Sequence, residues 1–117
     1  MTKIKKTRAI RLCALDEIPG DQSRGFMIDY KDFPLSLFMI RKNGHIYAYH
    51  NRCPHMGTSL DWQPDQFLDA SGDFIQCSTH GALFRIQDGL CLYGPCARQS
   101  LTNIPTEIRD NDVYIHI

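Results

Sequence analysis

An Asn-Gly pair between two β-prone runs is the strongest local signal in this sequence. Asn43 and Gly44 separate the runs 35–42 and 45–50. Asparagine and glycine accept the positive φ values that a two-residue hairpin turn requires. The pair therefore predicts two antiparallel strands joined by a tight turn, which makes β-structure the starting point for the rest of the chain.

Further short apolar runs, bounded by turn residues, extend this prediction along most of the sequence. No segment carries a sustained helical period, and at most one helical turn is expected at 16–20. The predicted fold class is all-β, with small antiparallel sheets arranged as a sandwich or barrel-like base. The expected strands are 8–15, 25–30, 35–41, 45–50, 74–76, 82–86, 90–92, 106–109 and 113–117.

Length and composition limit the classes of protein to which this chain can belong. The chain has 117 residues, of which 43% are hydrophobic and 22% charged, with a formal net charge of zero. These values are typical of one globular domain. No apolar run is long enough to span a bilayer, and the N-terminus lacks the apolar core of a signal peptide, so a cytoplasmic protein without membrane contact is expected. The basic first eleven residues have no interleaved aromatics and predict a solvated tail, not a nucleic-acid site.

The strand pattern is interrupted between residues 51 and 81. We therefore expect a single domain, 1–117, in which a base formed by 1–50 and 82–117 carries a loop-rich insert, 51–81. Long irregular segments inside compact domains are usually functional. We therefore expect the functional residues in the insert.

Two short motifs in the insert each combine a cysteine with a histidine: Cys53-Pro54-His55 and Cys77-Ser78-Thr79-His80. Five cysteines without a secretory signal predict reduced thiols and favour a metal or redox role over disulfides. Zinc binds two cysteines and two histidines, but its usual motifs pair Cys with Cys and His with His. The mixed order found here is the one needed by a two-iron cluster with two cysteines on one iron and two histidines on the other.

The two motifs, extended to Gly57 and Gly81, resemble the cluster-binding boxes of the Rieske [2Fe–2S] family. The likeness continues through Ala82-Leu83-Phe84, Asp88-Gly89 and Gly94-Pro95. It implies an antiparallel β base with a smaller cluster-binding subdomain. It also implies that Cys53 and Cys77 bind the inner iron, and that His55 and His80 bind the outer iron. The positions implied to surround the cluster are Met56, Gly57, Gly81, Phe84, Gly94 and Pro95.

The same resemblance implies a low reduction potential. Thr58 and Thr79 stand where Rieske proteins of cytochrome bc complexes carry two disulfide-forming cysteines. Ala82 and Phe84 stand where those proteins carry hydroxyls near the cluster. Fewer hydrogen bonds to the cluster stabilise its reduced form less, which lowers the potential. The pattern is similar to the ferredoxin-type branch of the family.

A ferredoxin-type Rieske protein is implied to be a one-electron carrier, passing electrons from a flavin reductase to a terminal oxygenase. The sequence contains no glycine-rich phosphate loop for a nucleotide cofactor, so it is not expected to be an enzyme alone. Two alternatives remain open. One is a Rieske-like small subunit of a multicomponent oxidoreductase of the nitrite-reductase type. The other is a zinc-binding structural module.

The remaining cysteines and histidines are expected to be structural. Cys91 and Cys96 are separated by four residues, which fits neither a C-x-x-C redox site nor the cluster, so they are interpreted as small apolar residues beside it. Cys13 is expected in the core. His45 and His50 are expected on opposite faces of one strand, which argues against a catalytic iron site.

The insert also carries an acidic segment that lengthens the gap between the two motifs. Asp61, Asp65, Asp69 and Asp73 accompany the aromatic residues Trp62 and Phe67. Two interpretations remain open: a packed cap over the subdomain, and a docking surface for a basic redox partner, because complementary charge mainly speeds encounter.

Overall fold

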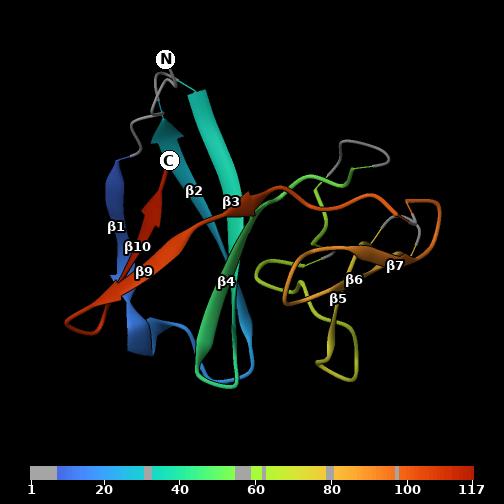
Figure 1. The fold of residues 1–117 in the computed structure, drawn as a ribbon, viewed down its shortest axis with the longest axis horizontal. Coiled ribbons are helices and arrows are strands. Elements are labelled where there is room, and N and C mark those ends of the chain that lie inside the picture. Colours follow the sequence, from blue (N-terminus) through green and yellow to red (C-terminus); the bar gives the residue numbers. More distant parts are fainter. Residues whose placement is uncertain (1–7, 31–32, 55–58, 62, 79–80, 97) are drawn as a thin grey trace, which may run out of the picture.

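Three small antiparallel sheets make up the fold in a computed structural model of the chain (Figure 1). The structure describes residues 8–30, 33–54, 59–61, 63–78, 81–96 and 98–117. Within this part of the chain the sole helical element is the 3₁₀ turn η1, Leu15–Glu17, where one helical turn was expected nearby. The all-β prediction is confirmed. No helix in the described residues has the length and apolarity needed to cross a membrane.

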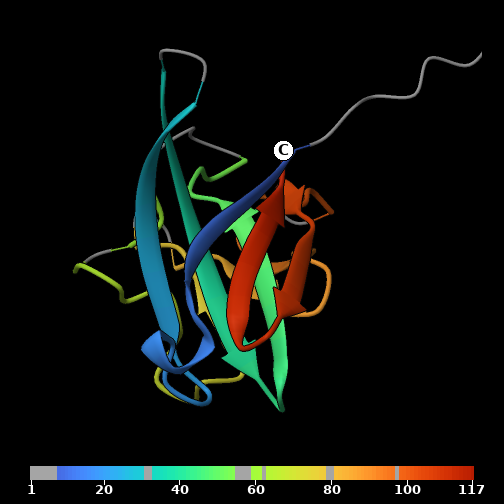
Figure 2. The ribbon, with the colours of Figure 1, turned by 90° about the vertical axis from the view of Figure 1, so that its left-hand side faces the viewer.

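The base consists of two sheets that pack against each other. One has the order β1-β10-β9, formed by Ala9–Ala14, Asp112–His116 and Thr106–Arg109. The other has the order β2-β3-β4-β8, formed by Ser23–Tyr30, Phe33–Lys42, His45–His50 and Asn103–Ile104. In Figure 2 the blue and red strands β1, β10 and β9 lie in front of the teal and green strands β3 and β4. Their facing side chains form a buried apolar core that includes Cys13, as expected, together with Ile18, Leu37, Met39, Ala48, Ile104, Val113 and Ile115.

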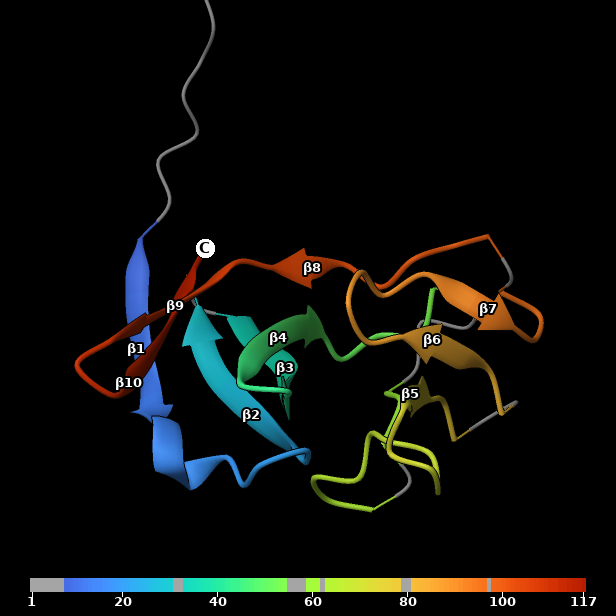
Figure 3. The same cartoon turned by 60° about the horizontal axis from the view of Figure 1, so that its bottom comes forward.

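The third sheet lies beside the base and has the order β5-β6-β7, formed by Phe74–Gln76, Leu83–Arg85 and Cys91–Tyr93 (Figures 1 and 3). Two of its three strands lie beyond residue 81, in the part of the chain that was expected to belong to the base. The insert predicted at 51–81 therefore covers only the first part of this second structural unit. Short strands of three residues carry too little pattern to reveal which sheet they join.

Strand β3 connects the two units because both of its faces are buried. Leu37 and Met39 point into the base core, whereas Phe38 and Ile40 belong to a second apolar cluster that also contains residues of the third sheet. Successive side chains of a strand alternate between its two faces, so a continuous apolar run can contact two cores at once. The run Leu37–Ile40 thus holds the second unit against the base.

The hairpin turn predicted at Asn43-Gly44 is confirmed. Asn43 has φ 52° and Gly44 has φ 80°, and the flanking strands pair from Lys42↔His45 to Leu37↔His50. Two positive φ values are the signature of the type I′ turn, whose twist matches that of the strands. One strand, β8, was not predicted, since its two residues present no alternation.

Candidate metal centre

Cys53 and Cys77 belong to the same buried apolar cluster, although they come from different segments. Cys53 follows the end of β4 by three residues, and Cys77 follows β5 directly. Their exposed fractions are 2% and 1%, respectively. His55 and His80, together with Met56 and Gly57, lie outside the described residues. The structure therefore brings the two predicted cysteine ligands into one buried environment.

The segment that contains Cys77 is folded as a tight turn. The N–H of Cys77 donates to the Ala82 carbonyl at 2.9 Å, and the N–H of Gly81 donates to the Cys77 carbonyl at 3.0 Å. Gly81 has φ 64°, in the left-handed region that a residue with a Cβ rarely adopts. Residues 77–82 join β5 to β6, and glycine at position 81 supplies the positive φ in this connection.

Asn51 fixes the segment that contains Cys53, although no motif in the sequence points to this residue. Its side-chain amide donates to Ser36 Oγ at 3.2 Å and to Asp61 Oδ1 at 3.0 Å. Its side-chain oxygen accepts from the N–H of Leu60 at 2.8 Å. The side chain therefore joins strand β3 to both ends of the loop that carries the first motif. The sequence offered one indication of this role, namely a polar residue two positions before Cys53.

The loop that contains Gly94 packs against Ala82, the residue that directly follows the second motif. Gly94 has φ 109°, and a Cβ placed on it would come within 3.0 Å of the Cα and Cβ of Ala82. This close approach of two backbones requires glycine. Ala82 and Phe84 are both buried, so the positions expected to lack hydroxyls are apolar and enclosed.

Tyr49 supports the other end of the third sheet. Its hydroxyl donates to the Ile86 carbonyl at 2.6 Å, and burial raises the pKa of this phenol well above its ordinary value. The adjacent Gly89 has φ 74°, and its missing Cβ would approach Tyr49 Cε1 to 2.8 Å. The turn at Asp88-Gly89 therefore rests directly on a base side chain.

The structure brings Cys91 and Cys96 together. Their sulfur atoms lie 2.7 Å apart, and both side chains are buried, with exposed fractions of 3% and 0%. Burial, followed by the hydrogen bond to Cys91, raises the pKa of the Cys96 thiol to about 12, and nearby Cys53 adds to this effect. Both cysteines are buried in the same apolar cluster as Cys53 and Cys77, but the sequence spacing did not reveal their contact.

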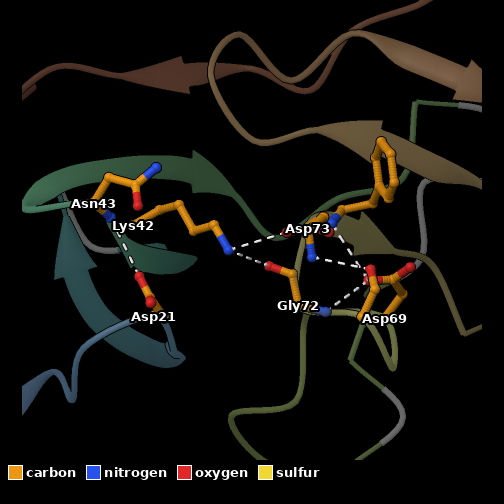
Figure 4. A network of polar contacts seen from close by, with 8 residues as sticks. Asp21, Lys42, Asn43, Asp69, Gly72 and Asp73 are labelled. Carbon is orange, nitrogen blue, oxygen red and sulfur yellow. Dashed lines mark hydrogen bonds and ion pairs between the residues drawn. The ribbon is translucent and has the colours of Figure 1, made fainter.

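The acidic segment of the insert uses its carboxylates for internal contacts. Asp65 Oδ1 accepts from the N–H of Gly25 at 2.8 Å. Asp69 Oδ1 accepts from the N–H groups of Gly72 and Phe74 at 3.1 and 3.3 Å, which closes the loop before β5. Lys42 Nζ reaches across from the base to the Gly72 carbonyl at 3.1 Å and to Asp73 at 3.2 Å (Figure 4).

An aromatic contact anchors the same segment. The Phe67 ring is buried and stacks on Phe38 with centroids 4.3 Å apart and planes 7° from parallel. Gly25 leaves room for this ring, since a Cβ there would lie 3.3 Å from it. Trp62 lies outside the described residues. Between the two interpretations of the insert, these contacts favour the packed cap.

The histidines of β4 occupy ordinary strand positions. His45 is exposed, and His50 is partly buried, where desolvation lowers the pKa of its imidazole. His50 lines a cavity of about 800 Å³ together with Asn51, Arg52 and Cys53. His50 and Cys53 therefore line the same cavity.

Comparison with known proteins shows which family and which solved structures the chain is similar to. The Rieske [2Fe-2S] domain family model matches residues 8–107. A solved chain of the complex of reduced oxygenase and oxidized ferredoxin in carbazole 1,9a-dioxygenase has 23% identity and a TM-score of 0.71, covering 92% of this chain and 91% of the other. The ferredoxin of carbazole 1,9a-dioxygenase from Nocardioides aromaticivorans IC177 has 18% identity and a TM-score of 0.70, covering 95% and 97%.

A larger protein contains a similar domain. The terminal oxygenase of carbazole 1,9a-dioxygenase from Novosphingobium sp. KA1 has 20% identity and a TM-score of 0.75, but the match covers 94% of this chain and only 30% of the oxygenase chain. Identities this low show a common fold and nothing further. No curated protein sequence matches the chain.

Two antiparallel base sheets, a third small sheet and two loops that place Cys53 and Cys77 in one buried cluster form an all-β domain with a candidate metal centre. The chain belongs to the Rieske [2Fe-2S] domain family, and a Rieske-type [2Fe–2S] cluster is its cofactor. The residues present fit this group: two thiols share a buried apolar cluster, and glycines at 81 and 94 allow two loops to approach closely.

Proposed function

We propose that this protein is a one-electron carrier whose cluster is held by Cys53 and Cys77 on the inner iron and by His55 and His80 on the outer iron. When bound, the cluster accepts and releases one electron at a time. The observation that carries the ligand assignment is the burial of both thiols in one apolar cluster, on the two segments that bear the Cys-x-His and Cys-x-x-His motifs.

The surrounding residues suit a carrier of low potential. Ala82 and Phe84 are buried and carry no hydroxyl that could donate a hydrogen bond to the cluster. The loop at Gly94 packs on Ala82, which is itself buried. Such a site offers less stabilisation to the extra negative charge of the reduced cluster than a site rich in hydrogen-bond donors.

We further propose that the chain delivers electrons from a flavin reductase to a terminal oxygenase, in the cytoplasm. Two structural matches support this direction, since they are ferredoxins of carbazole 1,9a-dioxygenase and align over nearly their whole length. Leu92 and Tyr93 of β7 are exposed apolar residues beside the loop that packs on the second motif. Apolar surface near a redox centre is suited to brief contact with a partner protein.

Stopped-flow spectroscopy tests this proposal. The reduced protein, mixed with an oxidised Rieske-type terminal oxygenase, is expected to lose its reduced spectrum in a second-order reaction. A flavin reductase with NADH should restore that spectrum. Substitution of Tyr93 by serine should slow both reactions, and the matched substitution of exposed Met27 on β2, Met27→Ser, should leave them unchanged.

The two alternatives give other results. A subunit of a nitrite-reductase type complex would co-purify with its large subunit and would not exchange electrons as a free protein. A zinc module would be colourless, whereas an iron–sulfur protein is red-brown. Either result would overturn the proposal.

A further inference from the structure

Two cysteines outside the proposed ligand set are in contact, one at the start of β7 and the other in the loop that follows it. The Sγ atoms of Cys91 and Cys96 lie 2.7 Å apart, about 0.7 Å more than the S–S bond of a disulfide. We propose that Cys91 and Cys96 form a reversible disulfide when the protein meets a peroxide, so that this pair is an oxidant-responsive site beside the cluster.

Backbone hydrogen bonds hold both cysteines in place. The N–H of Cys91 donates to the Gln99 carbonyl at 2.7 Å, and the N–H of Gln99 donates to the Cys96 carbonyl at 2.9 Å. One residue, Gln99, thus binds the backbone at both cysteines. Because the two thiols are already held together, little chain entropy has to be lost when the bond forms.

The position of the pair decides what can oxidise it. Cys91 and Cys96 are buried, but the residues directly after Cys91, Leu92 and Tyr93, are exposed. The pair therefore lies next to solvent-exposed residues, although its own side chains are enclosed. A small oxidant such as hydrogen peroxide, which is hardly larger than water, suits such an enclosed pair better than a bulky disulfide reagent.

The chemistry balances in two steps. The Cys91 sulfur, which is the less deeply buried of the two, attacks one peroxide oxygen, breaking the O–O bond and giving a sulfenic acid and one water. The Cys96 sulfur then displaces the sulfenic oxygen as a second water and forms the S–S bond. Two thiols are oxidised by two electrons in all, and one hydrogen peroxide is reduced to two waters.

The bond would act on the loop that covers the second motif. Cys91 and Cys96 enclose Gly94, whose backbone packs on Ala82. A disulfide would fasten this loop in the conformation that the structure shows. Disulfides that form in reducing compartments are usually transient and responsive to oxidants, which is the role proposed here. The proposal does not depend on which residues bind the cluster.

Trypsin separates the cysteines of this chain into three peptides. Cleavage at arginine gives 12–24 with Cys13, 53–85 with Cys53 and Cys77, and 86–98 with Cys91 and Cys96. The purified holoprotein is treated with equimolar hydrogen peroxide, denatured in iodoacetamide with a chelator, digested and analysed by mass spectrometry. Absorbance recorded during the treatment follows the cluster independently.

We expect most of the 86–98 peptide to appear unalkylated and lighter by two hydrogen atoms, while 53–85 carries two alkyl groups and 12–24 carries one. Dithiothreitol should return 86–98 to its doubly alkylated form. In Cys91→Ser the peptide should instead carry one alkyl group on Cys96, and in the control Cys13→Ser the disulfide should still form. Doubly alkylated 86–98 after peroxide, a cross-link from it to 53–85, or irreversible sulfinic acid in the wild-type protein would each overturn the proposal.

Discussion

The carbonyl of Leu60 accepts a hydrogen bond of 2.9 Å from the N–H of Ser78, the residue that follows Cys77. Leu60 also donates its own N–H to Asn51, two residues before Cys53. Leu60 therefore links the two motif-bearing segments, through the Asn51 side chain on one and the Ser78 backbone on the other. The spacing of the two predicted cysteine ligands depends on this link as well as on the sheets.

Asn51 is expected to be a positioning residue for the first motif. Asn51→Ala should lower the free energy of unfolding by about 1–3 kcal/mol, because it leaves the N–H of Leu60 without its acceptor and breaks the contacts to Ser36 and Asp61. The variant should also release its iron to a chelator faster than wild type. Chemical denaturation and the decay of visible absorbance measure the two effects.

The matched control for that prediction is Asn103→Ala, since Asn103 is exposed on β8. It should change stability by less than about 0.5 kcal/mol. Equal behaviour of the two variants would remove the positioning role from Asn51.

Asp69 separates the packed-cap interpretation of the insert from the docking interpretation. Asp69→Ala should cost about 1–2 kcal/mol, because Gly72 and Phe74 lose the acceptor of their N–H groups. Asp69→Asn keeps an oxygen in place and should be nearly neutral in thermal melts. Electron-transfer rates of Asp69→Asn should equal those of wild type at low and high salt. A rate that falls at low salt alone would show that the charge steers a partner.

Asp88 links stability to pH near the turn before β7. Hydrogen bonds from Arg85 and from the N–H of Leu90 lower the pKa of this carboxyl from 3.8 to about 2. Since the folded-state pKa is depressed, the stabilisation is complete above pH 3.8 and is lost as the pH falls toward about 2. The pair is exposed to solvent, so the effect should stay below about 1 kcal/mol.

The measurement is the difference in melting temperature between wild type and Asp88→Asn at a series of pH values. This difference should shrink between pH 4 and pH 2. In the Arg85→Gln background most of the dependence should disappear, because the first cause of the shift is removed. A difference that stays constant with pH would contradict the assignment.

The potential of the cluster should fall in the lower part of the Rieske range, about −150 to 0 mV. Ala82→Ser should raise it, because a hydroxyl beside the second motif can donate to the cluster. The control Ala48→Ser places the same change in the base core and should leave the potential unaltered. Voltammetry measures the reduction potentials of the wild type and the two variants. A wild-type value above about +200 mV would show that missing hydroxyls do not set the potential.

Local signals in the sequence were enough to predict much of the fold. The Asn43-Gly44 turn depends on two residues alone, and both have the positive φ values that the pattern requires. The run at 35–41 was recognised as a strand, but its role in connecting two cores was not. That role depends on what packs against each face, and the sequence of one strand does not contain that information.

Less of the candidate site than of the fold could be predicted from the sequence. The motifs predict Cys53 and Cys77 as ligands by local spacing, and the structure shows that both side chains are buried. Asn51 was missed because its partners, Ser36, Leu60 and Asp61, are brought to it by tertiary packing. The contact of Cys91 with Cys96 depends on the turn at Gly94 and on Gln99, and a spacing of four intervening residues does not predict it.

Analysis of iron and acid-labile sulfide in the purified protein tests the central claim most directly. With the cluster bound by Cys53, His55, Cys77 and His80, wild type should contain about two irons and two sulfides per chain. Cys77→Ala should lose both, whereas Cys13→Ala in the base core should retain them. One zinc per chain with no sulfide, or an unchanged cluster in Cys77→Ala, would contradict the account.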